Sequence, residues 1–105
     1  MQFVIVAKDG PGSETLARRM AARPAHMAGL RDLKAEGRII DGGAMLGPDG
    51  AMVGSVVLCD FPDRAALDAY IATETYRREG VWQDITIYPL RRVDWAALMA
   101  PTHAE

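Results

Sequence analysis

His26 is the residue of this sequence whose type and setting best suit proton-transfer chemistry. It stands two positions after Pro24, and apolar Leu30 and Leu33 follow it at helical spacing. A histidine on the inward face of a helix is either a hydrogen-bonded core group or a proton-transfer group at a pocket, because imidazole titrates near neutral pH. The other histidine, His103, is third from the C-terminal end. We therefore expect no metal site built on paired histidines.

Five further side chains are candidates for a pocket around this histidine. Ser55 can offer a hydroxyl from a strand, although a strand serine is also commonly satisfied by backbone. Arg19 and Arg23 precede the histidine by about two turns and one turn, so they either attract an anionic substrate or are solvated. Tyr76 and Trp82 either wall an apolar or aromatic ligand or belong to the core.

The remaining chemical motifs argue against several classes of site. Cys59 is the single cysteine and lies in the apolar run 56–61, which predicts a buried, inert thiol. A lone cysteine excludes an internal disulfide, a zinc ribbon and a thioredoxin-type motif. The Gly-Pro-Gly segment at 10–12 lacks the further glycines and the lysine of a phosphate loop. We predict that the protein uses neither a metal nor a cofactor.

Length and composition indicate one ordinary globular domain. The chain has 105 residues, of which 50% are hydrophobic and 25% are charged. The net charge of −2 provides no basic footprint for nucleic acid. No apolar run approaches the roughly 20 residues of a membrane span, and the N-terminus does not resemble a signal peptide. We expect a cytoplasmic protein that binds neither nucleic acid nor membrane.

Hydrophobic periodicity and turn signals predict four strands and two main helices. A helix from Ser13 to Glu36 ends at Gly37, and Pro24 either kinks it or divides it in two. A second helix starts at Asp63 and frays over 73–75, and 94–99 suggest a short terminal helix. The expected strands cover 3–7, 38–46, 51–61 and 81–90, and the expected buried stripe of the first helix is Leu16, Met20, Met27, Leu30 and Leu33.

The order of these elements predicts an α+β fold of the ferredoxin-like βαββαβ type. In it, two helices cover one face of a four-stranded antiparallel sheet, and residues 47–50 join the middle strands as a hairpin. The other face stays uncovered, and an apolar face of this kind usually meets a partner, which favours a homodimer. We assign 1–92 to this domain and 93–105 to a C-terminal extension with a disordered end. The apolar strand residues available for the uncovered face are Val4, Val6, Val57, Ile85 and Ile87.

Five segments carry a family resemblance: the strand 3–5 (Phe-Val-Ile), the helix segments 23–26 (Arg-Pro-Ala-His) and 33–38 (Leu-Lys-Ala-Glu-Gly-Arg), the pair 54–55 (Gly-Ser), and 76–82 (Tyr-Arg-Arg-Glu-Gly-Val-Trp). Together they resemble the YciI-like (YCII-related) proteins over about residues 2 to 92. The resemblance implies a dimeric α/β barrel and a pocket organised around a histidine and an aspartate. Dehydrochlorinase-type elimination is known in the family, although most members have no assigned reaction.

The resemblance also assigns the pair to positions in this chain. The family histidine falls on His26, and the acid of an Asp-Pro-Tyr-like segment falls on Glu74, where this chain reads Glu-Thr-Tyr. A glutamate is one methylene longer, so the pair is either kept with altered geometry or lost. Asp41, on the strand after the first helix, is the second candidate carboxylate.

These observations converge on a small homodimeric enzyme that acts on a small molecule without a cofactor. His26 is the expected general acid/base and Glu74 or Asp41 its partner, while Ser55 and Arg23 are expected at the substrate. Tyr76 is expected there too, and elimination or isomerisation suits this set best. The alternatives are a non-catalytic ligand-binding or regulatory module on the same fold, and a related oxygenase or decarboxylase.

Overall fold

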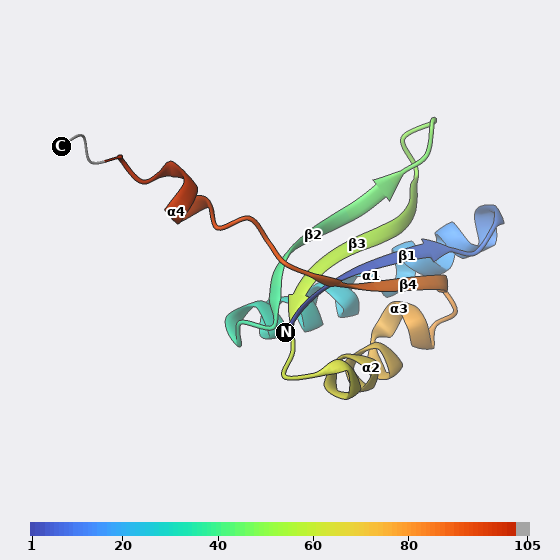
Figure 1. Cartoon of the computed structure of the whole chain (residues 1–105). Helices are drawn as coiled ribbons and strands as arrows, with labels where there is room; N and C mark the ends of the chain where they lie inside the picture. Colours follow the sequence, from blue (N-terminus) through green and yellow to red (C-terminus); the bar gives the residue numbers. More distant parts are fainter. Residues whose placement is uncertain (103–105) are drawn as a thin grey trace.

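A computed structural model describes residues 1–102 as one antiparallel sheet with helices on one of its faces (Figure 1). His103 and the end that we predicted to be disordered lie outside the described residues. The strand order is β2-β3-β1-β4, which is the ferredoxin-like arrangement and confirms the predicted fold class. The elements are β1 (Gln2–Asp9), α1 (Gly12–Ala35), β2 (Ile39–Leu46), β3 (Met52–Asp60), α2 (Arg64–Thr73), α3 (Thr75–Arg78), β4 (Trp82–Leu90) and α4 (Trp95–Met99).

The four strands and the β2–β3 hairpin lie where the sequence predicts them. In the turn, Gly47 N–H donates to the carbonyl of Ala51 and Gly50 N–H to that of Gly47. Gly50 has φ of 84°, a left-handed conformation that glycine adopts without steric cost. The short turn makes β2 and β3 antiparallel neighbours.

One face of the sheet forms the hydrophobic core with the helices. Phe3, Ile5 and Ala7 alternate along β1 toward this face and are at most 1% exposed. Strand register places Ile85 and Ile87 of β4 beside them, and Val57 of β3 also lies in the core. The prediction that Val57, Ile85 and Ile87 are available for the uncovered face is therefore wrong, and of the predicted set only Val4 and Val6 lie there.

The buried side of α1 differs from the predicted stripe. The helix runs without interruption through Pro24, so the two-helix alternative is wrong. Its buried residues are Thr15, Arg19 and His26, with Ala22, Leu30 and Leu33 packed against the core. Met20 and Met27 are 50% and 45% exposed, so the prediction failed for them. The helix therefore turns polar side chains inward, which is a feature of a site rather than of a plain core.

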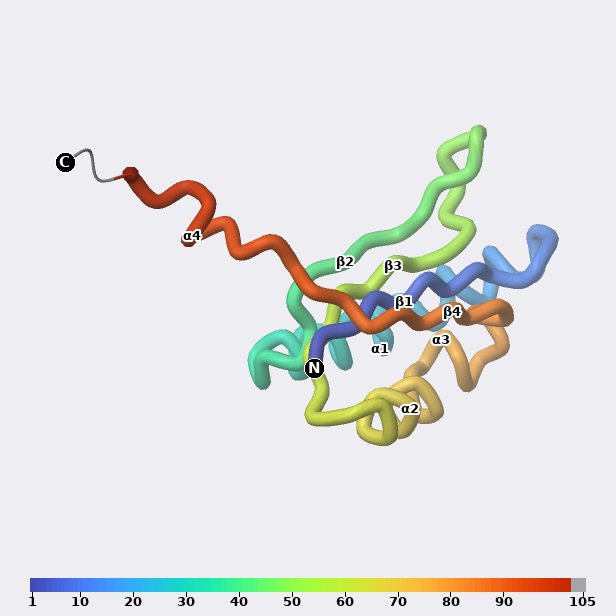
Figure 2. Tube along the Cα trace, in the orientation of Figure 1, coloured from blue at the N-terminus to red at the C-terminus, as the bar shows by residue number. Residues whose placement is uncertain are grey.

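Two short helices complete the chain. Sequence periodicity missed α3, a single turn that follows α2 directly after Glu74. The predicted terminal helix is present as α4, and Figure 2 shows it in the red segment that leads away from the body. Across residues 1–102, no helix has the length and apolar character needed to cross a membrane.

Candidate functional site

Glu74 lies between α2 and α3 and contacts the imidazole of His26 on α1. It is the last residue before α3 and caps that helix, because its Oε2 accepts a hydrogen bond of 2.7 Å from the N–H of Tyr76. Its other oxygen, Oε1, contacts His26 Nδ1. Both residues are buried, with exposed fractions of 6% for His26 and 7% for Glu74. The structure thus brings together the two residues that the resemblance pairs, despite the longer glutamate side chain.

The contact fixes the chemistry of the two ring nitrogens. An ionised carboxylate can only accept hydrogen bonds, so Nδ1 carries the hydrogen that donates to Glu74. In the neutral ring this leaves Nε2 with a free lone pair. Among residues 1–102, Nε2 has no hydrogen-bond partner, and it is not one of the fully buried polar atoms without partners. In a side chain that is 6% exposed, Nε2 is thus the ring nitrogen left without a partner in the described chain.

Two aromatic rings enclose the imidazole. Tyr76 is stacked on His26 with 3.8 Å between ring centroids and 14° between planes, and Trp82 meets the same imidazole edge-on at 6.0 Å. Tyr76 is held by α3, which is tied to the start of β4 by a 2.9 Å hydrogen bond from Arg77 to the carbonyl of Trp82. Both rings are almost fully buried. Of the two alternatives for Tyr76 and Trp82, a ligand wall or the core, both rings occupy the core, where they pack on His26.

Arg19, two turns before His26 on α1, is the charged centre of the cluster. Its Nη1 donates to both carboxylate oxygens of Asp9 at 2.9 Å, and its guanidinium lies 4.6 Å from the centroid of the Tyr76 ring. Burial raises the pKa of the Asp9 carboxyl, and the guanidinium opposes that rise. Sequence reasoning missed Asp9, which reads as the first residue of a turn.

Ser55 connects Arg19 to Trp82 through its hydroxyl oxygen. Arg19 Nη2 donates to Ser55 Oγ at 2.9 Å and Trp82 Nε1 donates to it at 3.1 Å. Neither donor can act as an acceptor, so these two bonds use both lone pairs of the hydroxyl. The Ser55 O–H is therefore committed to donate. Within the described chain it has no acceptor in hydrogen-bond range.

Gly54 lets Ser55 reach this position. A Cβ at Gly54 would lie 2.5 Å from the carbonyl oxygen of Ala7, which is backbone and cannot move aside cheaply. The missing side chain thus permits the close approach of β3 and β1 directly before Ser55. In the Gly-Ser pair, Gly54 thus has a packing role and Ser55 a hydrogen-bonding role.

The other two predicted site residues lie apart from the pair. Asp41 is exposed on β2, opposite Leu58, and its carboxylate accepts a 2.8 Å hydrogen bond from the N–H of Gly42. Arg23 is partly buried on α1. Burial raises the pKa of the Tyr76 hydroxyl, and the charges of Arg19 and Arg23 oppose that rise. In residues 1–102, neither Asp41 nor Arg23 has a side-chain hydrogen bond to the pair.

Cys59 has the buried, inert character that the sequence predicts. It is fully buried in the core, and its thiol donates weakly to the carbonyl of Phe3 at 3.6 Å. Burial, with a smaller contribution from the charge of Asp60, raises the pKa of the thiol to about 11. A thiol of this kind is a poor nucleophile near neutral pH. In the described part of the chain, no cluster of three or more histidine, cysteine or acidic residues could hold a metal.

Two cavities each include one acidic residue of the cluster in their walls. One of about 490 Å³ lies between α1 and α2 and includes Glu74, Tyr70 and Leu30 in its wall. The other, of about 450 Å³, lies beside Asp9 at the turn between β1 and α1. Both are large enough for a small molecule and bring it to a charged member of the cluster.

The chain is a small α+β domain of the ferredoxin-like class, and it contains a buried histidine–carboxylate pair. Residues 1–91 match the YCII-related domain family, and the chain belongs to that family. It is 31% identical over 99 residues to protein YciI of Escherichia coli O6:H1, covering 89% of this chain and 99% of that protein. It is 32% identical over the same length, with the same coverage, to an uncharacterised protein of Haemophilus influenzae.

Solved structures show the same fold. The dehydrochlorinase TftG of Burkholderia phenoliruptrix AC1100, named for 5-chloro-2-hydroxyhydroquinone and solved with 2,5-dihydroxybenzoquinone, is 27% identical. It superposes with a TM-score of 0.79, covering 90% of this chain and 98% of TftG. An antibiotic biosynthesis monooxygenase shares the fold, with a TM-score of 0.54 and 23% identity. The alignment covers 89% of this chain and 99% of the monooxygenase chain.

Proposed function

We propose that this protein is a small-molecule enzyme in which His26 transfers protons and Glu74 orients it. The observation that carries the proposal is the buried contact between Glu74 Oε1 and His26 Nδ1, which leaves Nε2 as the free nitrogen. In an elimination, Nε2 accepts a proton from the substrate and the leaving group departs with its bonding electrons. The carboxylate stabilises the imidazolium that forms, and the same nitrogen can return the proton in an isomerisation.

The donors around Arg19 indicate what kind of substrate suits the site. The Ser55 O–H has both lone pairs occupied and donates, and Arg19 Nε is a buried N–H without a partner in the described chain. Two donors without a partner among residues 1–102, one of them on the guanidinium itself, favour an oxygen acceptor such as a carbonyl or phenolate oxygen. Tyr76 and Trp82 are at most 1% exposed, so their rings pack on His26 and support it from the protein side. We infer a small oxygenated substrate.

The likeness to TftG supports this substrate class. That protein is named as a dehydrochlorinase of a chlorinated hydroxyhydroquinone and was solved with a dihydroxybenzoquinone, which is planar and rich in oxygen. The proposal extends the reaction type and the ring chemistry to this chain. Neither step of the proposed reaction uses a metal or a cofactor.

A decisive test combines binding with turnover. We expect the protein to bind 2,5-dihydroxybenzoquinone in an absorbance titration and to release chloride from 5-chloro-2-hydroxyhydroquinone. His26→Ala should lower the rate at least about 100-fold, with a smaller change in affinity, because it removes the proton acceptor. Ser55→Ala should mainly weaken binding. Glu79→Gln, an exposed acid in the same segment, is the matched control and should leave both unchanged.

A non-catalytic binding module on the same fold is the alternative. It is favoured by the depth at which Tyr76 covers His26, since a stacked core histidine needs no substrate. This alternative predicts that the quinone binds without turnover and that His26→Ala only weakens affinity. Failure of both binding and chloride release would contradict the proposed substrate class.

We also propose that the protein is a homodimer formed through the uncovered face of its sheet. Val4 and Val6 of β1 lie on that face, beside Leu58 and Val56 of β3. Tyr88 of β4 is opposite Val4 and is 57% exposed. An apolar face of this kind, backed by no helix in the described chain, is self-complementary when two copies meet.

A further inference from the structure

The C-terminal arm, residues 91–100, is exposed along its whole length although its far half is apolar. Trp95, Leu98 and Met99 are 60%, 63% and 74% exposed, and Val93 near the root is 53% exposed. The match to the YCII-related family ends at residue 91, so residues 92–100 of the arm lie outside the shared domain. Four large apolar side chains on one short exposed segment call for a covering surface.

The arm nevertheless has a defined local structure. Asp94 caps α4, because its carboxylate accepts a 3.0 Å hydrogen bond from the N–H of Ala97. A helix of five residues is far too short to be stable in water by itself, since helix nucleation is costly. Such a helix persists when its apolar side packs on another surface.

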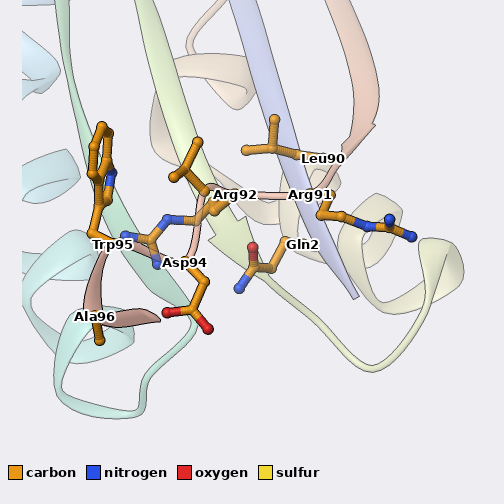
Figure 3. Close-up of a pocket in the computed structure, with 8 residues that line it drawn as sticks. Gln2, Leu90, Arg91, Arg92, Asp94, Trp95 and Ala96 are labelled. Atoms are coloured by element: carbon orange, nitrogen blue, oxygen red, sulfur yellow. The ribbon is translucent and has the colours of Figure 1, made fainter. Parts of the chain in front are cut away.

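The described part of the protomer does not provide that surface. Figures 1 and 2 show the arm leading away from the sheet and the helices. The molecule measures 63 Å along its longest axis but only 33 and 22 Å along the other two. Between the root of the arm and the sheet lies an open cavity of about 650 Å³, with Trp95, Arg92 and Gln2 among its lining residues (Figure 3). The space beside the arm is thus free to receive another element.

The root of the arm is continuous with the uncovered face of the sheet. Gln2 is opposite Leu90 in the β1–β4 ladder and directly precedes Phe3, which points into the core. Because side chains alternate along a strand, Gln2 belongs to the uncovered face. A second copy seated on that face would therefore reach the cavity and the base of the arm.

We propose that the arm packs on a second copy of this chain, with Trp95, Leu98 and Met99 as its contacts. In a two-fold dimer the contact occurs twice, so each protomer both gives an arm and receives one. Tryptophan at such a contact contributes strongly because it buries a large rigid surface. The proposal rests on the homodimer proposed above, and the measurements below separate the two.

Tryptophan fluorescence reports directly on the arm. The chain has two tryptophans, and Trp82 is fully buried, so the difference between the emission of the wild type and of Trp95→Phe isolates Trp95. We expect a blue-shifted emission, protected from iodide quenching, at concentrations where the dimer forms. Dilution into the monomer range should shift it to the red and expose it to quenching. Emission typical of exposed tryptophan in the dimer would overturn the proposal, as would protection that persists in the monomer.

Sedimentation of the full-length chain supplies the second measurement. Trp95→Ser/Leu98→Ser should raise the dimer dissociation constant at least about 100-fold, because each contact is lost twice. Met20→Ser is the matched control, since Met20 is 50% exposed on α1 in the helix layer, and it should leave the constant unchanged. A wild-type dimer whose constant is unaffected by the arm variant would refute the arm contact alone. A wild-type monomer at high concentration would refute the homodimer itself.

Discussion

At the scale of single residues, the Glu74 carboxylate accepts two hydrogen bonds, one with each oxygen. Glu74 Oε2 caps α3 through the N–H of Tyr76, while Oε1 accepts from His26. The orientation of the imidazole therefore depends on the same group that starts the helix carrying the stacked ring. The methylene that distinguishes glutamate from the expected aspartate leaves both contacts in place.

Glu74→Gln should invert the tautomer of His26. Glutamine has one acceptor and one donor at its end, so its oxygen can satisfy Tyr76 N–H only if its NH₂ group faces Nδ1. Nδ1 must then accept, and the ring hydrogen moves to Nε2, which removes the free base. Long-range ¹H–¹⁵N NMR of the neutral ring distinguishes the two tautomers. Glu79→Gln serves as the control, and a ring that keeps Nδ1–H in Glu74→Gln would contradict the assigned contact.

At the scale of elements, a buried ion pair fastens α1 to β1. The side chains of Arg19 and Asp9 are 3% and 4% exposed, and Ser55 extends the link to β3. Removing one partner of such a pair leaves a charge in the interior without compensation. The pair therefore holds the helix that carries His26 against the sheet that carries Ser55.

A double-mutant cycle should show strong coupling in this pair. Asp9→Asn and Arg19→Met should each lower the free energy of unfolding by about 3–5 kcal/mol, and the double variant by clearly less than the sum. Urea denaturation at fixed protein concentration measures each value. The exposed Arg64–Asp68 pair, at 2.8 Å, is the control and should couple by less than about 0.5 kcal/mol. Additive losses at Asp9 and Arg19 would contradict the coupling.

The same carboxyl should give stability a defined dependence on pH. Because burial raises the pKa of Asp9 above its ordinary value of 3.8, the folded protein holds a proton between the two values that the unfolded chain has released. The contribution of Asp9 to the free energy of unfolding therefore falls as pH rises through that interval. Asp9→Asn should remove this fall from the pH profile of urea denaturation.

The elements were readable from the sequence to different degrees. Strands and the hairpin followed from alternating residues and a Gly-Pro-Asp-Gly turn, which act locally. On α1, the inward placement of His26, Leu30 and Leu33 was correct, whereas Met20 and Met27 face outward and Arg19 is buried instead. Hydrophobicity alone does not predict a buried arginine. The single-turn α3 is too short to leave a periodic signal.

The sequence predicted only some residues of the candidate site, because tertiary contacts bring the others together. Family resemblance singled out His26 and Glu74, which lie 48 positions apart and meet only through the packing of α1 on α3. Asp9 and Arg19 form their pair by tertiary contact, and no local pattern marks it. The sequence left Asp41 and Glu74 as alternatives because strand pairing decides where Asp41 lies.

At the scale of the whole molecule, the sheet separates two kinds of surface. Its helix-covered face contains the cluster around His26, and its other face presents valine, leucine and tyrosine side chains of three strands. A substitution on the uncovered face can therefore change assembly without touching the cluster. This separation makes the homodimer testable independently of the chemistry.

Tyr88→Lys should convert the proposed dimer into a monomer while leaving the fold intact. Tyr88 is 57% exposed on the uncovered face, so the lysine costs little in the protomer, but in a dimer it would bring two positive charges into an apolar interface. Met20→Lys, on the helix layer, should stay dimeric. Sedimentation gives the mass of each variant, and circular dichroism checks that each is folded. If Tyr88→Lys remained a dimer with unchanged affinity, the two copies would have to meet elsewhere, because a two-fold contact through this face places the substitution in the interface twice.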